Sequence, residues 1–180
     1  MLITRKCRAV ANYIIEETND FNEDKTFREQ VMMTGRRLQK ILYFCNIEYM
    51  KKHNGESFFE DSFYAWPSGP VIPNIYRIYI QYQDGKNFPR YEGELLELTV
   101  EEKSIIDKVL KQTQEFDSID LINITKCNNG PWQKLYNEDD SEHNQIIPKE
   151  EIYGFYLDKN ILILTQEQSG PVKKLTLPKK

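Results

Sequence analysis

Apolar residues recur at helical spacing in several segments of the chain. The strongest case is residues 35–52, whose apolar stripe consists of Leu38, Ile41, Leu42, Cys45 and Tyr49. Thr34 stands where an N-cap is needed, and Asn54 or Gly55 can take the left-handed conformation that ends a helix. The pattern therefore predicts a helix with defined ends.

Shorter helices are predicted on both sides of this segment, and the fold class is mainly α, within the α+β class. Residues 6–18 carry an apolar stripe and precede a polar connection over residues 18–29. Thr99 and Glu102 form a capping-box pattern. The other predicted helices run from Pro73 to about Tyr82, from 99 to 113, from an N-cap at Ser118 with Ile119 facing inward, from Pro131, and from Pro148 to about Tyr156.

A segment rich in proline and glycine, the Trp66–Pro73 corner, interrupts the helical pattern. Phe63 and Tyr64 precede it and indicate a small β element before the corner. Proline fixes φ, and Gly69 can adopt an unusual φ directly before Pro70. The corner is therefore rigid, with Trp66 as its large aromatic residue.

Two interpretations of this corner stay open. It is either a structural keystone that joins a strand to a helix, or a presented recognition surface that includes Trp66, Ser68, Gly69 and Pro70. A buried Trp66 predicts that Trp66→Ala costs about 3–5 kcal/mol, whereas an exposed anchor predicts lost partner binding with little loss of stability.

The C-terminal residues differ from the rest of the chain. Residues 161–165 form an apolar, β-prone run, a turn follows at Ser169-Gly170-Pro171, and a second run extends to Leu177. This pattern favours a hairpin or a strand edge that pairs with a partner. We expect one helical domain over residues 1–157 and a C-terminal extension over residues 158–180.

Composition narrows the function classes. The net charge of −4 argues against a nucleic-acid partner, and no apolar run approaches the roughly 20 residues that a membrane span requires. The N-terminus lacks the pattern of a secretory signal. Three widely spaced cysteines fit a reducing cytoplasm.

The chain offers little catalytic material, so we expect no enzyme, no cofactor and no bound metal. His53 and His143 have no nucleophile or metal-ligand spacing around them. Cys45 lies on an apolar face, whereas Cys127 stands beside a turn and could be exposed. A basic cluster at a helix start, Arg36, Arg37 and Lys40, is either a solvated helix face or an electrostatic contact for an acidic protein or nucleic acid.

Three motifs together resemble one family. They are Leu38-Gln39-Lys40-Ile41-Leu42-Tyr43-Phe44, the corner from Ala65 through Pro73, and Gly130-Pro131-Trp132. In order and rough spacing they are similar to the Panacea domain, a SocA-like antitoxin domain of bacteria and their phages. The resemblance spans about residues 8 to 156, and its middle motif is the most specific.

The resemblance implies a mostly helical, non-catalytic domain without a cofactor. It implies a cytoplasmic protein, bacterial or phage-encoded, that neutralises a toxin by direct binding, and one branch of the family is similar to an adaptor that delivers a toxin to a ClpXP-type protease. The implied partner is a protein: a toxin, a protease or a host defence factor. Trp66, Pro131 and Trp132 then mark either the shared frame or a partner contact.

Other functions stay open at this point. A phage or mobile-element protein that blocks a host immune factor would have a similar composition. Nucleic-acid regulation through the basic cluster and hydrolysis at Cys127 or His143 are further alternatives. The oligomeric state, the host and the identity of the target do not follow from the sequence.

Overall fold

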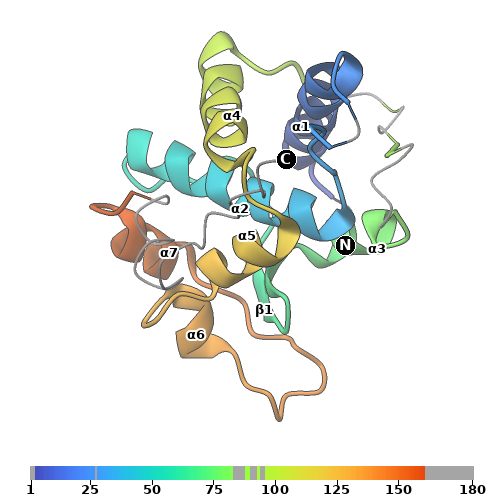
Figure 1. The fold of residues 1–180 in the computed structure, drawn as a ribbon. Coiled ribbons are helices and arrows are strands. Elements are labelled where there is room, and N and C mark those ends of the chain that lie inside the picture. The colour runs from blue at the N-terminus through green and yellow to red at the C-terminus, as the bar shows by residue number, and fades with distance from the viewer. Residues whose placement is uncertain (1–2, 27, 83–87, 90–92, 94–95, 161–180) are drawn as a thin grey trace, which may run out of the picture.

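The computed structural model describes residues 3–26, 28–82, 88–89, 93 and 96–160. Its elements in chain order are α1 (Arg5–Glu23), α2 (Gly35–Lys52), β1 (Tyr64–Trp66), β2 (Gly69–Val71), α3 (Pro73–Tyr79), α4 (Val100–Thr113), α5 (Ser118–Thr125), α6 (Pro131–Leu135) and α7 (Lys149–Tyr156) (Figure 1). The mainly α fold class is confirmed. The predicted C-terminal hairpin lies outside the described residues.

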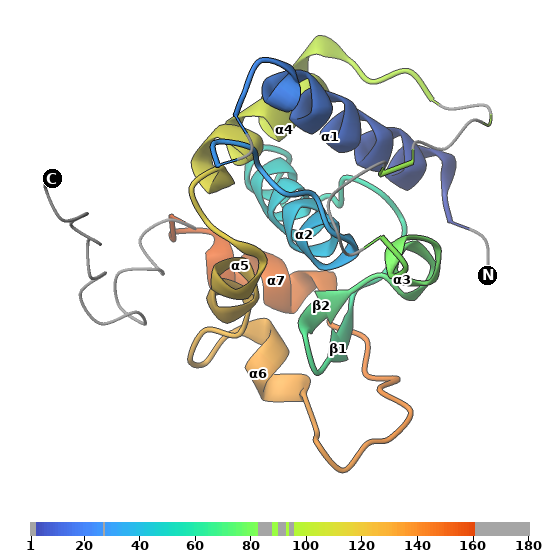
Figure 2. The same cartoon turned by 45° about the vertical axis from the view of Figure 1, so that its right-hand side comes forward.

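Helix α2 forms the centre of the fold. It packs against α1, α3, α4, α5, α7 and β2, and Figure 2 shows α1 and α4 on one side of it and α5, α7 and the hairpin on the other. The Thr34 hydroxyl accepts a hydrogen bond from Arg37 N at 3.1 Å, and the chain leaves the helix through Asn54 (φ 51°) and Gly55 (φ 91°). Both predicted ends are therefore confirmed.

Helix α1 is five residues longer at its C-terminal end than the predicted stripe, so the polar connection expected from Thr18 was wrong over residues 19–23. Residues 19–21 and 23 are exposed, so the helix continues beyond the end of its buried apolar stripe. The Asn22 side chain donates a hydrogen bond to Val31 O and accepts one from Val31 N. These two bonds fix the end of α1 against the following segment. Tertiary contacts thus override a weak local preference.

The small β element begins just before the Trp66–Pro73 corner and continues into it. Strands β1 and β2 are antiparallel, with Tyr64 opposite Val71, Ala65 opposite Pro70 and Trp66 opposite Gly69. On the other side of β1, Ala65 N donates to Gln145 O and Ile147 N donates to Phe63 O, each at 2.8 Å. Strand β1 therefore begins before the corner, as predicted, whereas β2 lies inside the corner because the proline-rich stretch folds back as a hairpin.

The remaining helix starts follow local signals, with one exception. Helices α3 and α6 begin at Pro73 and Pro131, and α4 has a complete capping box between Thr99 and Glu102. Helix α5 is capped by Asp117, so Ser118 is its first residue and not its cap. Ile119, expected inside, is 66% exposed.

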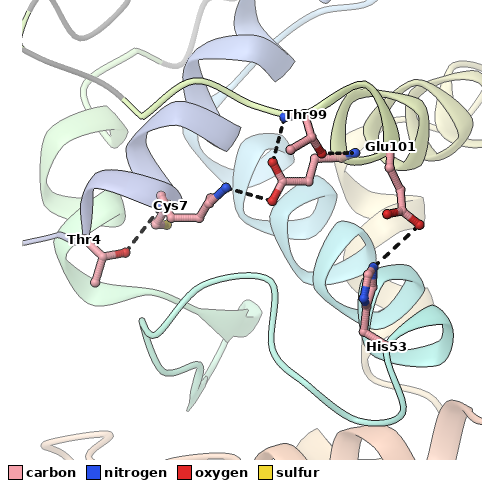
Figure 3. A network of polar contacts seen from close by, with 7 residues as sticks. Thr4, Cys7, His53, Thr99 and Glu101 are labelled. Carbon is pink, nitrogen blue, oxygen red and sulfur yellow. Dashed lines mark hydrogen bonds and ion pairs between the residues drawn. The ribbon is translucent and has the colours of Figure 1, made fainter.

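Two neighbouring carboxylates at the start of α4, Glu102 of the capping box and Glu101, contact α1 and the end of α2. Lys6 on α1 donates to the Glu102 carboxylate at 2.7 Å, while Glu102 accepts from Thr99 N at 2.9 Å. Figure 3 shows this network beside the neighbouring contact of His53, at the end of α2, with Glu101 on α4. The first turn of α4 is thereby fixed to α1 and α2.

Candidate functional site

Two polar side chains of α2 hold the hairpin. Gln39 accepts from Ile72 N at 2.8 Å and donates to Ile72 O at 3.2 Å, as a neighbouring strand would. Lys40 Nζ donates to Pro70 O at 2.8 Å. Since all these groups are buried, the hydrogen bonds satisfy backbone that would otherwise cost free energy. The edge of β2 is therefore covered by α2.

The expected basic cluster is divided between the core and the surface. Arg36 is exposed, but Arg37 and Lys40 are 2% and 0% exposed, so a solvated face formed by all three residues is wrong. The Arg37 guanidinium donates to Thr113 O at 2.8 Å and to Phe116 O. An electrostatic contact through this cluster would have Arg36 alone at the surface.

Burial changes the protonation of both inner cations. It lowers the pKa of Arg37 to about 10. It lowers the pKa of Lys40 well below its ordinary value, and the positive charges of Lys126 and Arg36 act in the same direction. No carboxylate pairs with Lys40 in the part of the chain that the structure describes. Burial therefore favours the neutral amine of Lys40 over the ammonium form, and the side-chain nitrogen donates to Pro70 O.

Gly69 is required by conformation and by space. Its φ is +90°, and a Cβ atom there would lie 2.6 Å from Thr125 Oγ1 and 3.0 Å from Lys40 Nζ. Pro70 beside it is buried, whereas Ser68 in the turn is half-buried. Helices α2 and α5 therefore close onto the hairpin from two sides.

The two tryptophans of the motifs are in contact. Trp132 on α6 donates its indole N–H to Trp66 O at 2.8 Å, and its ring stacks on Tyr136 at 4.6 Å. Lys126 Nζ lies 4.6 Å from the centre of the same ring. Trp132 is 7% exposed and follows the buried Pro131 at the start of α6. Trp132 is thus the buried tryptophan that joins α6 to the hairpin.

Trp66 is half-buried and is therefore more exposed than Trp132. The sequence did not indicate this difference between the two tryptophans. Its ring meets Tyr76 edge-on at 5.0 Å, and its indole nitrogen has no hydrogen-bond partner among the described residues. A hollow of about 250 Å³ opens beside it, lined in part by Tyr64, Pro73, Arg77 and Glu142. Trp66 therefore combines a structural contact with a face toward this hollow.

The thiols lie in the core. Cys7, Cys45 and Cys127 are all buried, and burial raises the pKa of each thiol. The expectation that Cys127 could be exposed was wrong, since it is 1% exposed with its sulfur 3.8 Å from the Tyr156 hydroxyl. A raised pKa disfavours the nucleophilic thiolate.

Over the described ranges, no group of three His, Cys, Asp or Glu side chains could hold a metal ion. None of the helices described has the combined length and apolarity needed to cross a bilayer.

Residues 38–133 match the family described as antitoxin SocA-like, Panacea domain. The chain belongs to this family. The matched segment of the Panacea domain begins at Leu38 and ends just after Trp132, so it contains the α2 motif, the hairpin and the tryptophan that the hydrogen bonds join. No curated protein and no solved structure matches the chain significantly.

The geometry explains why the three motifs occur together in this Panacea domain. Gln39 and Lys40 hold the hairpin backbone, and Trp132 holds its turn. Sequence reasoning missed these roles, although one signal was present: two polar residues interrupt an otherwise apolar run from Leu38 to Cys45. Arg37, which anchors the end of α4, carried no local signal.

Proposed function

We propose that this chain neutralises a protein toxin in the cytoplasm by binding to it directly. The observation that carries the proposal is membership of the SocA-like Panacea family over residues 38–133. An antitoxin of this kind needs a stable scaffold that presents a protein-binding surface. The hairpin held by Gln39, Lys40 and Trp132 supplies such a scaffold.

Direct binding predicts a partner encoded beside this chain, because toxin and antitoxin must be made together. The test is to express the product of the adjacent gene from an inducible promoter, with and without this chain. Growth arrest that this chain relieves supports the proposal. A matched control carries an early stop codon in the gene for this chain, so that relief by RNA is separated from relief by protein. Arrest that persists with the intact chain present would overturn the proposal.

A finer version of the proposal makes the chain an adaptor that delivers the toxin to a ClpXP-type protease. Direct inhibition and delivery differ in the fate of the toxin. Toxin abundance should stay constant under direct inhibition, and should fall only in cells that contain the protease under delivery. Immunoblots of the toxin in strains with and without the protease therefore separate the two versions. Relief of growth arrest in both strains supports direct inhibition.

A further inference from the structure

A groove of about 620 Å³ lies between the segment that follows α1 and the connection from α4 to α5. Its lining includes Phe21, Val31, Met32, Phe116, Asp117 and Ile119. Eight large apolar side chains are exposed in the described part of the chain, and three of them, Phe21 (41%), Met32 (49%) and Ile119 (66%), line this one groove. Clustered exposed apolar side chains mark interaction surfaces more often than scattered ones do. We name this feature the α1–α5 groove.

In the first wall of the α1–α5 groove, which follows α1, the Asn22 side chain forms two hydrogen bonds with the backbone of Val31. Asn22 Nδ2 donates to Val31 O at 2.9 Å, and Val31 N donates to Asn22 Oδ1 at 2.8 Å. Gln30 donates its amide to Lys25 O at 3.2 Å. The described residues of the segment between α1 and α2 are therefore held in place, although none of them belongs to a helix or a strand.

The second wall, residues 114–119, is fixed by hydrogen bonds from residues at the start of α2. Arg37 donates to Thr113 O and Phe116 O, which fixes the end of α4. The hydroxyls of Thr34 and Ser118 lie 3.1 Å apart and join the starts of α2 and α5. Figure 2 shows the α1–α2 connection beside the α4–α5 connection. Because both walls are fixed before binding, a partner would lose little free energy in ordering them.

Charge around the groove is unevenly placed. Near Ile119 the exposed carboxylates are Glu115, Asp117 and Asp120, whereas the one cation lining that end, Arg37, is buried against backbone carbonyls. At the other end, Lys25 Nζ lies 5.3 Å from the centre of the Phe21 ring, and Arg28 and Glu29 are both exposed, so charges of both signs are present there. Ile119 is therefore an apolar side chain in an acidic setting.

We propose that the α1–α5 groove is the surface that docks the toxin, and that the docking surface of the toxin carries an apolar side chain flanked by lysine or arginine. This inference rests on the proposed function. Apolar contact at Ile119 would supply affinity, and opposite charge at Glu115, Asp117 and Asp120 would supply orientation and association rate. The wall formed by residues 114–119 lies within the matched family segment, whereas the wall formed by Phe21 and residues 28–32 lies before it. The earlier wall is thus placed to select among toxins.

The first test compares Ile119→Lys with Val100→Lys in binding to the purified product of the adjacent gene. Both residues are exposed, at 66% and 86%, and both lie in the first turn of a helix that begins with a capping box. Any cost of placing a cation at a helix start is therefore common to the two variants. We expect Ile119→Lys to weaken binding about tenfold or more, and Val100→Lys to leave it unchanged within about twofold. Ile119→Ala serves as a milder second variant, with weaker binding expected and no added charge.

The second test concerns charge and compares Glu115→Lys with Glu138→Lys. Glu115 follows the C-terminal end of α4, where a cation suits the helix dipole, so the variant should keep its fold. Glu138 lies in an exposed acidic segment away from the groove. We expect Glu115→Lys to slow association and to reduce its dependence on salt, and Glu138→Lys to do neither. Circular dichroism of each variant verifies that it is folded.

The outcomes separate the two proposals. If the wild-type chain binds the adjacent product and Ile119→Ala, Ile119→Lys and Glu115→Lys bind it equally well, the docking surface is wrong while the proposed function stands. If the wild-type chain does not bind the adjacent product, the proposed function and the docking surface are both contradicted. Selective loss at Ile119 and Glu115, with both controls unchanged, supports the docking surface.

Discussion

The buried Lys40 makes a prediction about the pH dependence of stability. Its side chain is fully buried, its nitrogen donates to Pro70 O at 2.8 Å, and its pKa lies well below the ordinary value because burial disfavours the charged form. In the unfolded chain the same group titrates near about 10.4. Between the lowered pKa and that value, the unfolded state binds one more proton than the folded state. The free energy of unfolding therefore gains about 1.4 kcal/mol per pH unit from this residue as pH rises through the window.

Lys40→Met removes the titrating group and keeps most of the side-chain volume. As pH rises toward the pKa of an unfolded lysine, about 10.4, we expect the stability of the wild-type chain relative to Lys40→Met to rise, by at most about 1.4 kcal/mol per pH unit. Burial raises the pKa of Tyr43 and of Tyr156, which gives a contribution of opposite sign at high pH. Both proteins contain these tyrosines, so their contribution cancels in the comparison. Urea denaturation followed by circular dichroism at constant ionic strength measures the difference.

Lys111→Met provides the matched control, since Lys111 is an exposed lysine on α4. Because the Lys111 side chain is exposed to solvent, the free energy of unfolding of Lys111→Met should change with pH in parallel with that of the wild-type chain. A difference between the wild-type chain and Lys40→Met that stays constant with pH would refute the reasoning. Lys40 would then carry the same charge in the folded and the unfolded state, and burial would not have lowered its pKa.

Further predictions concern the glycine of the hairpin turn, the two tryptophans and the buried thiols. In urea denaturation, Gly69→Ala should lower the free energy of unfolding by about 1–3 kcal/mol, because φ is positive there and the new Cβ would meet Thr125. Gly154→Ala, at an open helical site, should raise it by about 0.5–1 kcal/mol. Equal effects of the two variants would contradict the account of the turn. Trp132→Ala should cost about 3–5 kcal/mol and Trp66→Ala less, because only Trp132 is buried and hydrogen-bonded through its indole; the reverse order in thermal denaturation would refute it. Since burial raises the pKa of every thiol, Cys7, Cys45 and Cys127 should react with a thiol reagent at neutral pH only after denaturation, and rapid reaction of the native protein would show that a thiol is accessible.

Local chemistry predicted the helix starts well. The Thr99–Glu102 capping box, the prolines at positions 73 and 131 and the Thr34 cap all act within a few residues of chain, so the sequence contains the whole signal. Asp117 was missed in favour of Ser118 because both residue types cap helices and adjacent positions compete. Errors of this kind shift an element by one residue and leave the fold unchanged.

The burial of charged residues could not be predicted in the same way. An apolar stripe indicates one buried face, but α2 is covered on nearly all sides, and which helix covers Arg37 or Lys40 is decided by residues 30 to 79 positions away. A lysine and an arginine at a helix start therefore suggested a solvated face. The apolar residues at positions 43, 44 and 47, outside the recognised stripe, were the available indication that α2 is buried all round.

In the candidate site, too, the local motifs could be predicted from the sequence, whereas the contacts between them could not. The three motifs were recognisable, but their mutual contacts depend on a hairpin whose partner side chains come from α2 and α6. The α1–α5 groove joins residues about 90 positions apart, and no pattern in the sequence connects Met32 with Ile119. Only the fold places these exposed apolar side chains on one surface.

The central claim is that this chain binds a toxin encoded beside it. Light scattering coupled to size-exclusion chromatography, on the purified chain mixed with the purified product of the adjacent gene, tests that claim most directly. The account predicts a single peak with the mass of a complex that contains both proteins in fixed proportion. Two separate peaks with the masses of the individual proteins, at concentrations well above those in the cell, would contradict it.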